Sequence, residues 1–173
     1  MDKVLRYTLI GVLFALFIGV GSPEFLLSDG SPSAVKAVSY HWFHANVWHL
    51  LANCLSIWLL IRTTRCRTAG KVLSQFAIAF LIASVMYFTA TKPVVGISNI
   101  LFAIVGLRTP SFRHSWWRRP ETIIFFAVTF LLLLVPQFSS VTHITSLLSG
   151  IGIAAISRTV RSLRSDVTRA IGK

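Results

Sequence analysis

Long apolar runs separated by short polar and basic stretches organise this sequence of 173 residues. Six of the runs are apolar enough to form helices in a lipid bilayer. They cover residues 7–21, 47–61, 72–87, 94–107, 122–136 and 141–156. Because a helix needs roughly 20 residues to cross a hydrocarbon core about 30 Å thick, flanking residues must lengthen several of these helices. The pattern predicts an all-α membrane protein in which residues 1–173 form a single domain of six transmembrane helices.

The composition favours a membrane protein over a soluble one. Hydrophobic residues make up 54% of the chain and charged residues only 13%, and the mean hydropathy is +0.72. A soluble domain carries about 25% charged residues. The two cysteines, Cys54 in an apolar run and Cys66 in a basic loop, do not suggest a disulfide framework. An apolar site makes Cys54 a packing residue rather than a nucleophile.

The distribution of basic residues predicts which side of the membrane each loop occupies. Lys and Arg number 17 and Asp and Glu number 5, which gives a net charge of +12. With six spans both termini lie on one side, and every Lys and Arg except Lys36 and Lys92 falls on that side. Basic loops remain in the cytoplasm. We therefore expect both termini to be cytoplasmic.

The basic residues also bear on binding partners. They are divided among loops and tails that flank the apolar runs, which argues against nucleic acid as a partner. The tail at residues 157–173 places Arg among Val, Leu and Ile at helical spacing. Such a basic amphipathic segment is attracted to anionic lipid. We expect this tail to lie at the inner surface of the bilayer.

The first apolar run, residues 7–21, has two interpretations. It follows Lys3 and Arg6 and ends at Gly21-Ser22, which resembles a secretory signal peptide. Removing it would leave five spans and place the new N-terminus outside the cell. We expect the run to be retained as the first span, because the later runs need a membrane core to pack against.

Polar residues occur at the beginning of three of the apolar runs. They are His41, His44, His49 and Asn53 around the start of the second run, Ser98 in the fourth and His143 in the last. His49 and Asn53 lie four residues apart and share one face of a helix. A polar group at membrane depth costs free energy unless it has a partner. These side chains should therefore face one another inside the protein.

Ser98 and His143 have the most informative chemistry of these residues. Serine is a weak nucleophile until a base takes its proton, and His143 on a neighbouring helix can be that base. Ser98 is expected at the N-terminal end of its helix, where unpaired backbone N–H groups and the helix dipole favour a negative charge. His49 and the Asn53 amide can complete an oxyanion hole. The set predicts acyl transfer by a serine nucleophile.

The acidic residues exclude two other arrangements. They are Asp2, Glu24, Asp29, Glu121 and Asp166, and all lie outside the apolar runs. No carboxylate is therefore available to orient His143, so the predicted machinery is a Ser-His dyad rather than a triad. A transporter or channel usually places ionisable residues at the membrane midplane. The sequence argues against that class as well.

The histidines allow a haem or metal interpretation. Two imidazoles on facing helices can bind a b-type haem, and His49 with His143 form such a pair. No Cys-x-x-Cys, His-Glu-x-x-His or carboxylate cluster indicates a zinc or di-metal site. We therefore expect no cofactor and no metal, with haem binding as the alternative.

The order and spacing of these residues resemble the rhomboid intramembrane serine proteases. The matching positions are His44, His49 and Asn53 around the second span, Gly96-Ile97-Ser98 in the fourth, and His143 in the last. The stretch from Asn99 to Gly106 also follows the family's pattern of small and apolar residues. The resemblance covers essentially the whole chain, as a rhomboid-like core of six helices with cytoplasmic termini.

The resemblance implies a role for each of these residues. Ser98 would be the nucleophile and His143 the general base and acid. The oxyanion would be stabilised by His49 and Asn53, and the supporting residues would be His44, Gly96 and Asn99.

The resemblance also implies a substrate and a location. The protein would be an endopeptidase that cleaves single-pass transmembrane proteins near the outer membrane face, in a bacterial cytoplasmic membrane. Water would reach Ser98 through a cavity roofed by residues 22–45 and 137–142, and substrate would enter past residues 122–136. Its partners would be these substrates and the lipid bilayer.

Departures from the family pattern leave an alternative open. Asn99 stands directly after the nucleophile and Ser146 three residues after His143, where the family usually has glycine. The two side chains would either bridge the fourth and sixth helices by a hydrogen bond or widen the gap between Ser98 and His143. A widened gap would make the chain a catalytically inactive rhomboid-like protein that binds membrane proteins or acts in their quality control. The loop at 22–45 also lacks the Trp-Arg pair usual there.

Overall fold

The described part of the chain consists of helices and short connections. The computed structural model describes residues 33–63, 69–90, 94–109 and 140–171, together with isolated positions between 4 and 18 and between 120 and 128. Its elements are α3 (Ala34–Ser39), η1 (Tyr40–Trp42), α4 (Val47–Thr63), α5 (Ala69–Met86), η2 (Tyr87–Thr89), α6 (Ser98–Arg108) and α9 (Ser140–Ile171). The all-α prediction is confirmed for these residues.

Four of the six predicted spans correspond to described helices. They are the runs at 47–61, 72–87, 94–107 and 141–156, which become α4, α5, α6 and α9. Among the described residues, two helices are long and apolar enough to cross a membrane, Gly70–Thr89 and Ser140–Arg169, and Val47–Leu60 and Ser98–Arg108 are shorter apolar helices. The runs at 7–21 and 122–136 lie largely outside the described residues, although the described positions within them are helical. The count of six spans and the side of the termini therefore remain predictions.

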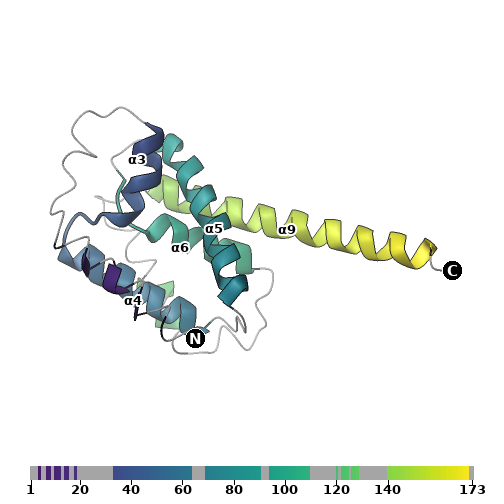
Figure 1. Cartoon of the computed structure of the whole chain (residues 1–173), viewed down its shortest axis with the longest axis horizontal. Coiled ribbons are helices and arrows are strands. Elements are labelled where there is room, and N and C mark those ends of the chain that lie inside the picture. Colours follow the sequence, from purple (N-terminus) through teal and green to yellow (C-terminus); the bar gives the residue numbers. More distant parts are fainter. Residues whose placement is uncertain are drawn as a thin grey trace.

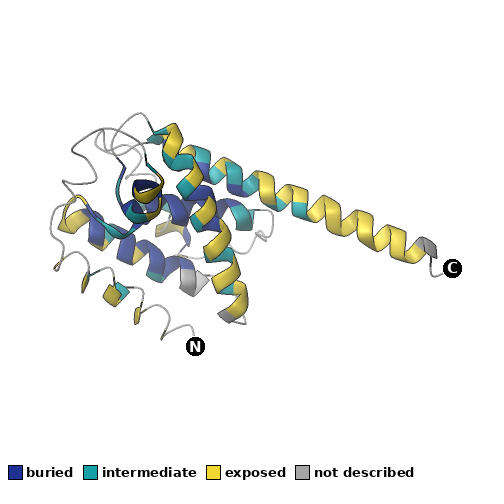
Figure 2. Ribbon diagram, turned by 45° about the horizontal axis from the view of Figure 1, so that its top comes forward, coloured by how far each residue is buried: buried dark blue, intermediate teal, exposed yellow. Residues whose placement is uncertain are grey.

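Helix α6 is the centre of the arrangement (Figure 1). It packs most extensively against α9, next against α5, and also against α4. Every residue of α6 from Ser98 to Gly106 is buried, and Figure 2 shows this helix almost entirely in the colour of buried residues. A helix that is apolar on all sides is stable only when neighbours surround it. The shortest predicted span is thus the core of the molecule.

Two glycines allow α6 and α9 to touch through their backbones. A Cβ atom added to Gly150 would collide with the Ala103 carbonyl oxygen and lie 3.0 Å from Gly106 Cα. A Cβ added to Gly106 would collide with the Leu147 carbonyl oxygen and lie 3.0 Å from Gly150 Cα. Small residues at such contacts let membrane helices approach closely. This contact holds the last turn of α6 directly against α9.

The segment before α4 contains helical structure that the sequence pattern does not predict. Ser33 caps α3, because its Oγ accepts a hydrogen bond from the Lys36 backbone N–H at 3.2 Å. Helix α3 leads directly into η1, where Tyr40 and His41 are both fully buried. Part of the stretch expected as a surface roof, residues 22–45, is therefore packed into the protein.

Helix α9 continues well past its predicted end at residue 156. It runs without interruption through nearly all of the basic tail, as far as Ile171, and Figure 1 shows it projecting from the body of the protein toward the C-terminus. Its 32 residues span about 48 Å at 1.5 Å per residue, whereas a hydrocarbon core is about 30 Å thick. The described tail is thus part of the last span's helix and not a separate segment. Its position at the membrane surface remains a prediction.

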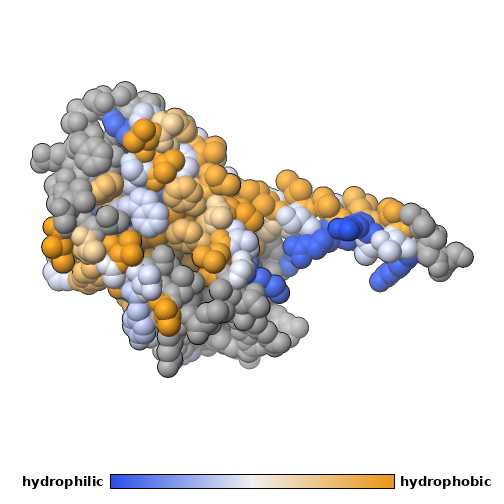
Figure 3. All heavy atoms as spheres, viewed as in Figure 1, coloured by the Kyte–Doolittle hydropathy of each residue, from blue (hydrophilic) through white to orange (hydrophobic). Residues whose placement is uncertain are grey.

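The outer surface of the described helices is largely apolar. Large hydrophobic side chains are exposed along α4 and α5, among them Trp48, Leu51, Leu73, Leu81 and Val85. Figure 3 shows hydrophobic residues over much of the body and hydrophilic residues gathered along one side of the projecting end of α9. Exposed apolar area on this scale is unusual for a soluble protein and suits contact with lipid.

Candidate functional site

Ser98 and His143 are in direct contact. Ser98 Oγ lies 2.8 Å from His143 Nε2, within hydrogen-bond distance. Ser98 is the first residue of α6 and His143 lies in the first turn of α9, and the two side chains are only 5% and 3% exposed. A serine hydroxyl bonded to an imidazole is the arrangement that makes serine a nucleophile. The two residues singled out in the sequence thus meet as expected.

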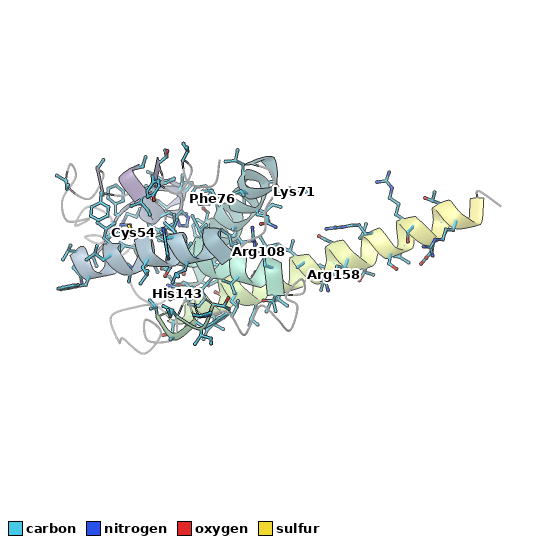
Figure 4. All side chains as sticks on the ribbon, turned by 90° about the horizontal axis from the view of Figure 1, so that it is seen from below. Cys54, Lys71, Phe76, Arg108, His143 and Arg158 are labelled. Atoms are coloured by element: carbon cyan, nitrogen blue, oxygen red, sulfur yellow. The ribbon has the colours of Figure 1, made fainter. Side chains whose placement is uncertain are left out.

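The packing of α6 on α9 accounts for this contact. Ser98 faces His143 at one end of the helix pair, and Gly106 faces Gly150 further along. Both numbers increase in the same direction, so the two helices run parallel to each other. Figure 4 shows His143 on the part of α9 that lies within the body, well before the projecting part.

Phe102 fixes the imidazole from a second side. Its ring centroid lies 4.8 Å from that of His143, with the planes inclined at 41°. Phe102 follows Ser98 by four residues, so both side chains lie on one face of α6. Sequence reasoning missed this residue because an apolar residue in an apolar helix gives no signal of its own. The spacing of four residues between Ser98 and Phe102 is the feature of the sequence that could have placed Phe102 beside the serine.

Gly96 brings the candidate oxyanion residues to the turn that carries the serine. Its φ is 101°, a conformation that favours glycine. A Cβ atom at this position would lie 2.7 Å from His49 Cε1, 2.9 Å from His49 Nε2 and 3.1 Å from Asn53 Nδ2. Two independent constraints therefore require glycine here. The close approach places His49 and Asn53 against the residue two positions before Ser98.

His44 and Asn53 are buried and have polar atoms that no described residue satisfies. His44 is 1% exposed and Asn53 0%, and His44 packs edge-on against His49 with ring centroids 5.3 Å apart. Within the described residues, neither ring nitrogen of His44 and neither amide atom of Asn53 has a hydrogen-bond partner. Burial, with a smaller contribution from His49, lowers the pKa of His44 to about 3, so its ring is neutral at pH 7. Unsatisfied buried donors and acceptors are available to a substrate.

Asn99 does not form the bond to Ser146 that was considered from the sequence. Its Nδ2 donates to the Tyr40 hydroxyl at 3.0 Å. Within the described residues, Asn99 Oδ1 and Ser146 Oγ are both buried without a hydrogen-bond partner. The expected bridge between the two helices is therefore wrong, because η1 places a different acceptor beside Asn99. The expected alternative, a wide gap between Ser98 and His143, is not found either.

His41, the remaining residue of the polar series, belongs to a different contact. Its Nε2 lies 3.1 Å from Ser84 Oγ on α5, and its ring centroid lies 4.9 Å from that of Phe80. Burial lowers the pKa of His41 to about 3, so this ring is also neutral at pH 7. His41 attaches η1 to α5 and is not part of the Ser98 site.

The described part of the site contains no carboxylate and no cluster of metal-ligating side chains. Asp166, the described carboxylate, is exposed on the projecting end of α9. Among the described residues, no three His, Cys, Asp or Glu side chains lie close enough together to hold a metal ion. Cys54 is buried with a free thiol in α4. In this part of the chain the chemistry available near Ser98 comes from hydroxyl, imidazole and amide groups.

Comparison with protein families identifies a known domain in the chain. The family model described as the Rhomboid domain matches residues 32–159. The comparison with curated proteins gave no match. The matched range is more than half of the chain and contains the whole candidate site, from His44 to His143.

Proposed function

The chain belongs to the rhomboid family, and from this premise we propose that it is an intramembrane serine endopeptidase that uses a Ser98-His143 dyad. The observation that carries the proposal is the 2.8 Å separation of Ser98 Oγ and His143 Nε2. Hydrogen-bond contact between a nucleophile and its base is the geometric requirement for this chemistry.

The proposed reaction has two steps. In the first, His143 takes the proton of Ser98 as Oγ attacks the scissile carbonyl carbon, and the imidazolium then gives that proton to the leaving amine. The peptide bond breaks and an ester forms on Ser98. In the second, His143 takes a proton from water, the hydroxide attacks the ester, and Ser98 regains a proton as the new carboxyl group leaves. Phe102 limits rotation of the ring between the steps through its contact with His143.

The negative charge of the tetrahedral intermediate needs fixed donors. The first backbone N–H groups of α6 lack acceptors within the helix because of their position. The Asn53 amide and His49 lie against Gly96 on the same side of the turn. We propose that these groups together stabilise the oxyanion.

The proposed substrates are single-pass transmembrane proteins cut near the outer membrane face. The carbonyl groups of a helix are already hydrogen-bonded, so the scissile segment must unwind before Ser98 can attack. Helix-breaking and small residues should therefore be favoured around the cleavage site. The proposed setting is a bacterial cytoplasmic membrane, with six spans and both termini in the cytoplasm as the basic loops indicate.

The alternative function, a catalytically inactive relative, depends on damage to the dyad by Asn99 and Ser146. The Ser98 to His143 distance of 2.8 Å and the bond from Asn99 to Tyr40 give no support to such damage. We therefore favour the enzyme.

A fluorophosphonate probe tests the proposal, because it reacts with activated serine hydroxyls. The purified protein should be labelled, and Ser98→Ala should remove the label. Ser56→Ala is the matched control, since Ser56 is also a buried serine, 3% exposed, but belongs to α4, whereas His143 belongs to α9. Wild-type protein that is folded but inert toward the probe would favour the inactive alternative. A Soret absorption band that His49→Ala removes would favour haem binding.

The oxyanion residues give a graded prediction. Asn53→Ala and His49→Ala should each slow cleavage by about 10² to 10³, because each removes one proposed donor and leaves the dyad in place. Labelling by the probe should slow but not disappear. Cleavage and labelling rates of the folded variants provide the measurement. Loss of folding in both variants would instead indicate that Asn53 and His49 serve in helix packing.

A further inference from the structure

Tyr40 contacts both ends of the short turn that carries the nucleophile. Its backbone carbonyl oxygen accepts a hydrogen bond from the Gly96 N–H at 2.9 Å. Its side-chain hydroxyl accepts one from Asn99 Nδ2 at 3.0 Å. Gly96 precedes Ser98 by two residues and Asn99 follows it directly, so a single residue from η1 holds the chain on each side of Ser98.

The same hydroxyl also ties the turn to α5. Tyr40 donates its hydroxyl hydrogen to the Ala83 carbonyl oxygen at 3.0 Å. A carbonyl can only accept, so the one hydroxyl hydrogen is used there and Asn99 must present its NH₂ group to the Tyr40 oxygen. The donors and acceptors thus assign the orientation of the Asn99 amide. Tyr40, Ala83 and Asn99 are all fully buried, where an unmade hydrogen bond is costly.

We infer that Tyr40 is a positioning residue that holds Ser98 at bonding distance from His143, and that its hydroxyl acts through Asn99. The inference rests on the proposed function, because positioning matters only if Ser98 reacts. The Tyr40 ring is itself held by stacking on Tyr87, with centroids 5.1 Å apart. Since Ser98 begins α6, its position depends on the turn before the helix as much as on the helix itself.

This arrangement accounts for the departure at Asn99. Where the family usually has glycine, this chain has an amide that would be a buried, unsatisfied donor without Tyr40. The two residues therefore form a unit, and a change at one should depend on the identity of the other. The effect of Tyr40→Phe should be large with Asn99 and small with glycine at position 99.

The test compares Tyr40→Phe, Asn99→Gly and the double variant in full-length protein in detergent. Tyr40→Phe keeps the ring and the carbonyl bond to Gly96 but leaves the Asn99 NH₂ unpaired, so probe labelling of Ser98 should slow about tenfold. With a reporter transmembrane substrate, kcat should fall while KM stays within about twofold, because the substrate surface is unchanged. In the Asn99→Gly background, Tyr40→Phe should slow labelling by no more than about threefold. The control is Tyr87→Phe, which removes the hydroxyl of the ring stacked on Tyr40. Among the described residues, that hydroxyl makes no hydrogen bond, so labelling should stay at the wild-type rate.

Each other outcome contradicts the inference in its own way. Equal effects of Tyr40→Phe in both backgrounds would mean that the hydroxyl does not act through Asn99. A lower unfolding temperature with unchanged labelling in the folded state would reduce Tyr40 to a structural residue. If wild-type protein is inert, the proposed function fails first. The Tyr40-Asn99 unit is then judged by thermal unfolding, where additive effects of the two substitutions would overturn it.

Discussion

Ser98→Ala and His143→Ala should each reduce cleavage of a reporter transmembrane substrate to the uncatalysed background. The expected loss is on the order of 10⁴-fold or more, because a nucleophile and its base act as one unit and neither works alone. For the same reason the double variant should be no slower than either single variant. Ser98→Ala leaves the buried His143 Nε2 without its 2.8 Å hydrogen bond, so it should lower the stability by about 1 to 3 kcal/mol. Cleavage assays and thermal unfolding of the purified variants provide the measurements.

The control for the histidine is His41→Gln. His41 is as deeply buried as His143 but bonds to Ser84 instead, and glutamine can keep that bond, so cleavage should continue. Ser98→Ala protein that still cleaves at the wild-type rate would eliminate the serine mechanism. Equal loss of activity in His41→Gln and His143→Ala would indicate that both histidines are needed for folding, and would contradict a specific role for His143 as the base.

Gly150→Ala should destabilise the protein by about 3 kcal/mol, near the upper range for overpacking, and should also slow labelling of Ser98. The added Cβ would collide with the Ala103 carbonyl oxygen and press on Gly106. These are backbone atoms of α6, which cannot move aside as a side chain can. Helix α9 would have to shift as a whole, carrying His143 away from Ser98. Thermal unfolding and probe labelling measure the two effects separately.

Gly152→Ala is the matched control on the same helix. No atom lies within 4 Å of a Cβ added at Gly152. Alanine also favours helix over glycine by about 1 kcal/mol, so Gly152→Ala should be neutral or slightly stabilising. Similar stability for the two alanine variants would mean that α6 and α9 are not in backbone contact at Gly150.

The positions of the described spans could be predicted from the apolar periodicity and length of each run. These two properties account for most of the predicted fold. The runs at 47–61 and 72–87 match α4 and α5 within three residues, because lipid and core both select apolar side chains. The same rule fails at the C-terminal end of α9 and in the segment before α4. The tail has polar residues and still continues the helix, since nothing in its sequence breaks it. Helix α3 is short and precedes the apolar run, so periodicity does not reveal it.

The candidate site was predictable where a polar side chain stands out against an apolar background. Ser98, His143, His49 and Asn53 could be found in this way, and their proximity followed from the cost of burying polar groups alone. Tyr40 could not be found, because it lies in a segment where a tyrosine is unremarkable. The error over Asn99 and Ser146 has the same origin. Without the placement of η1, Ser146 was the only visible partner for Asn99.

Because α9 is unbroken, His143 and the basic end belong to one continuous helix. The Gly106-Gly150 backbone contact is the point about which this helix would tilt. His143 lies about 10 Å from it on one arm, and Ile171 about 31 Å from it on the other, at 1.5 Å per residue. A tilt of about 5° would therefore move Ile171 by about 3 Å and His143 by about 1 Å. A movement of 1 Å is enough to break a hydrogen bond of ordinary length, so a small tilt of the basic end of α9 would be enough to separate His143 from Ser98.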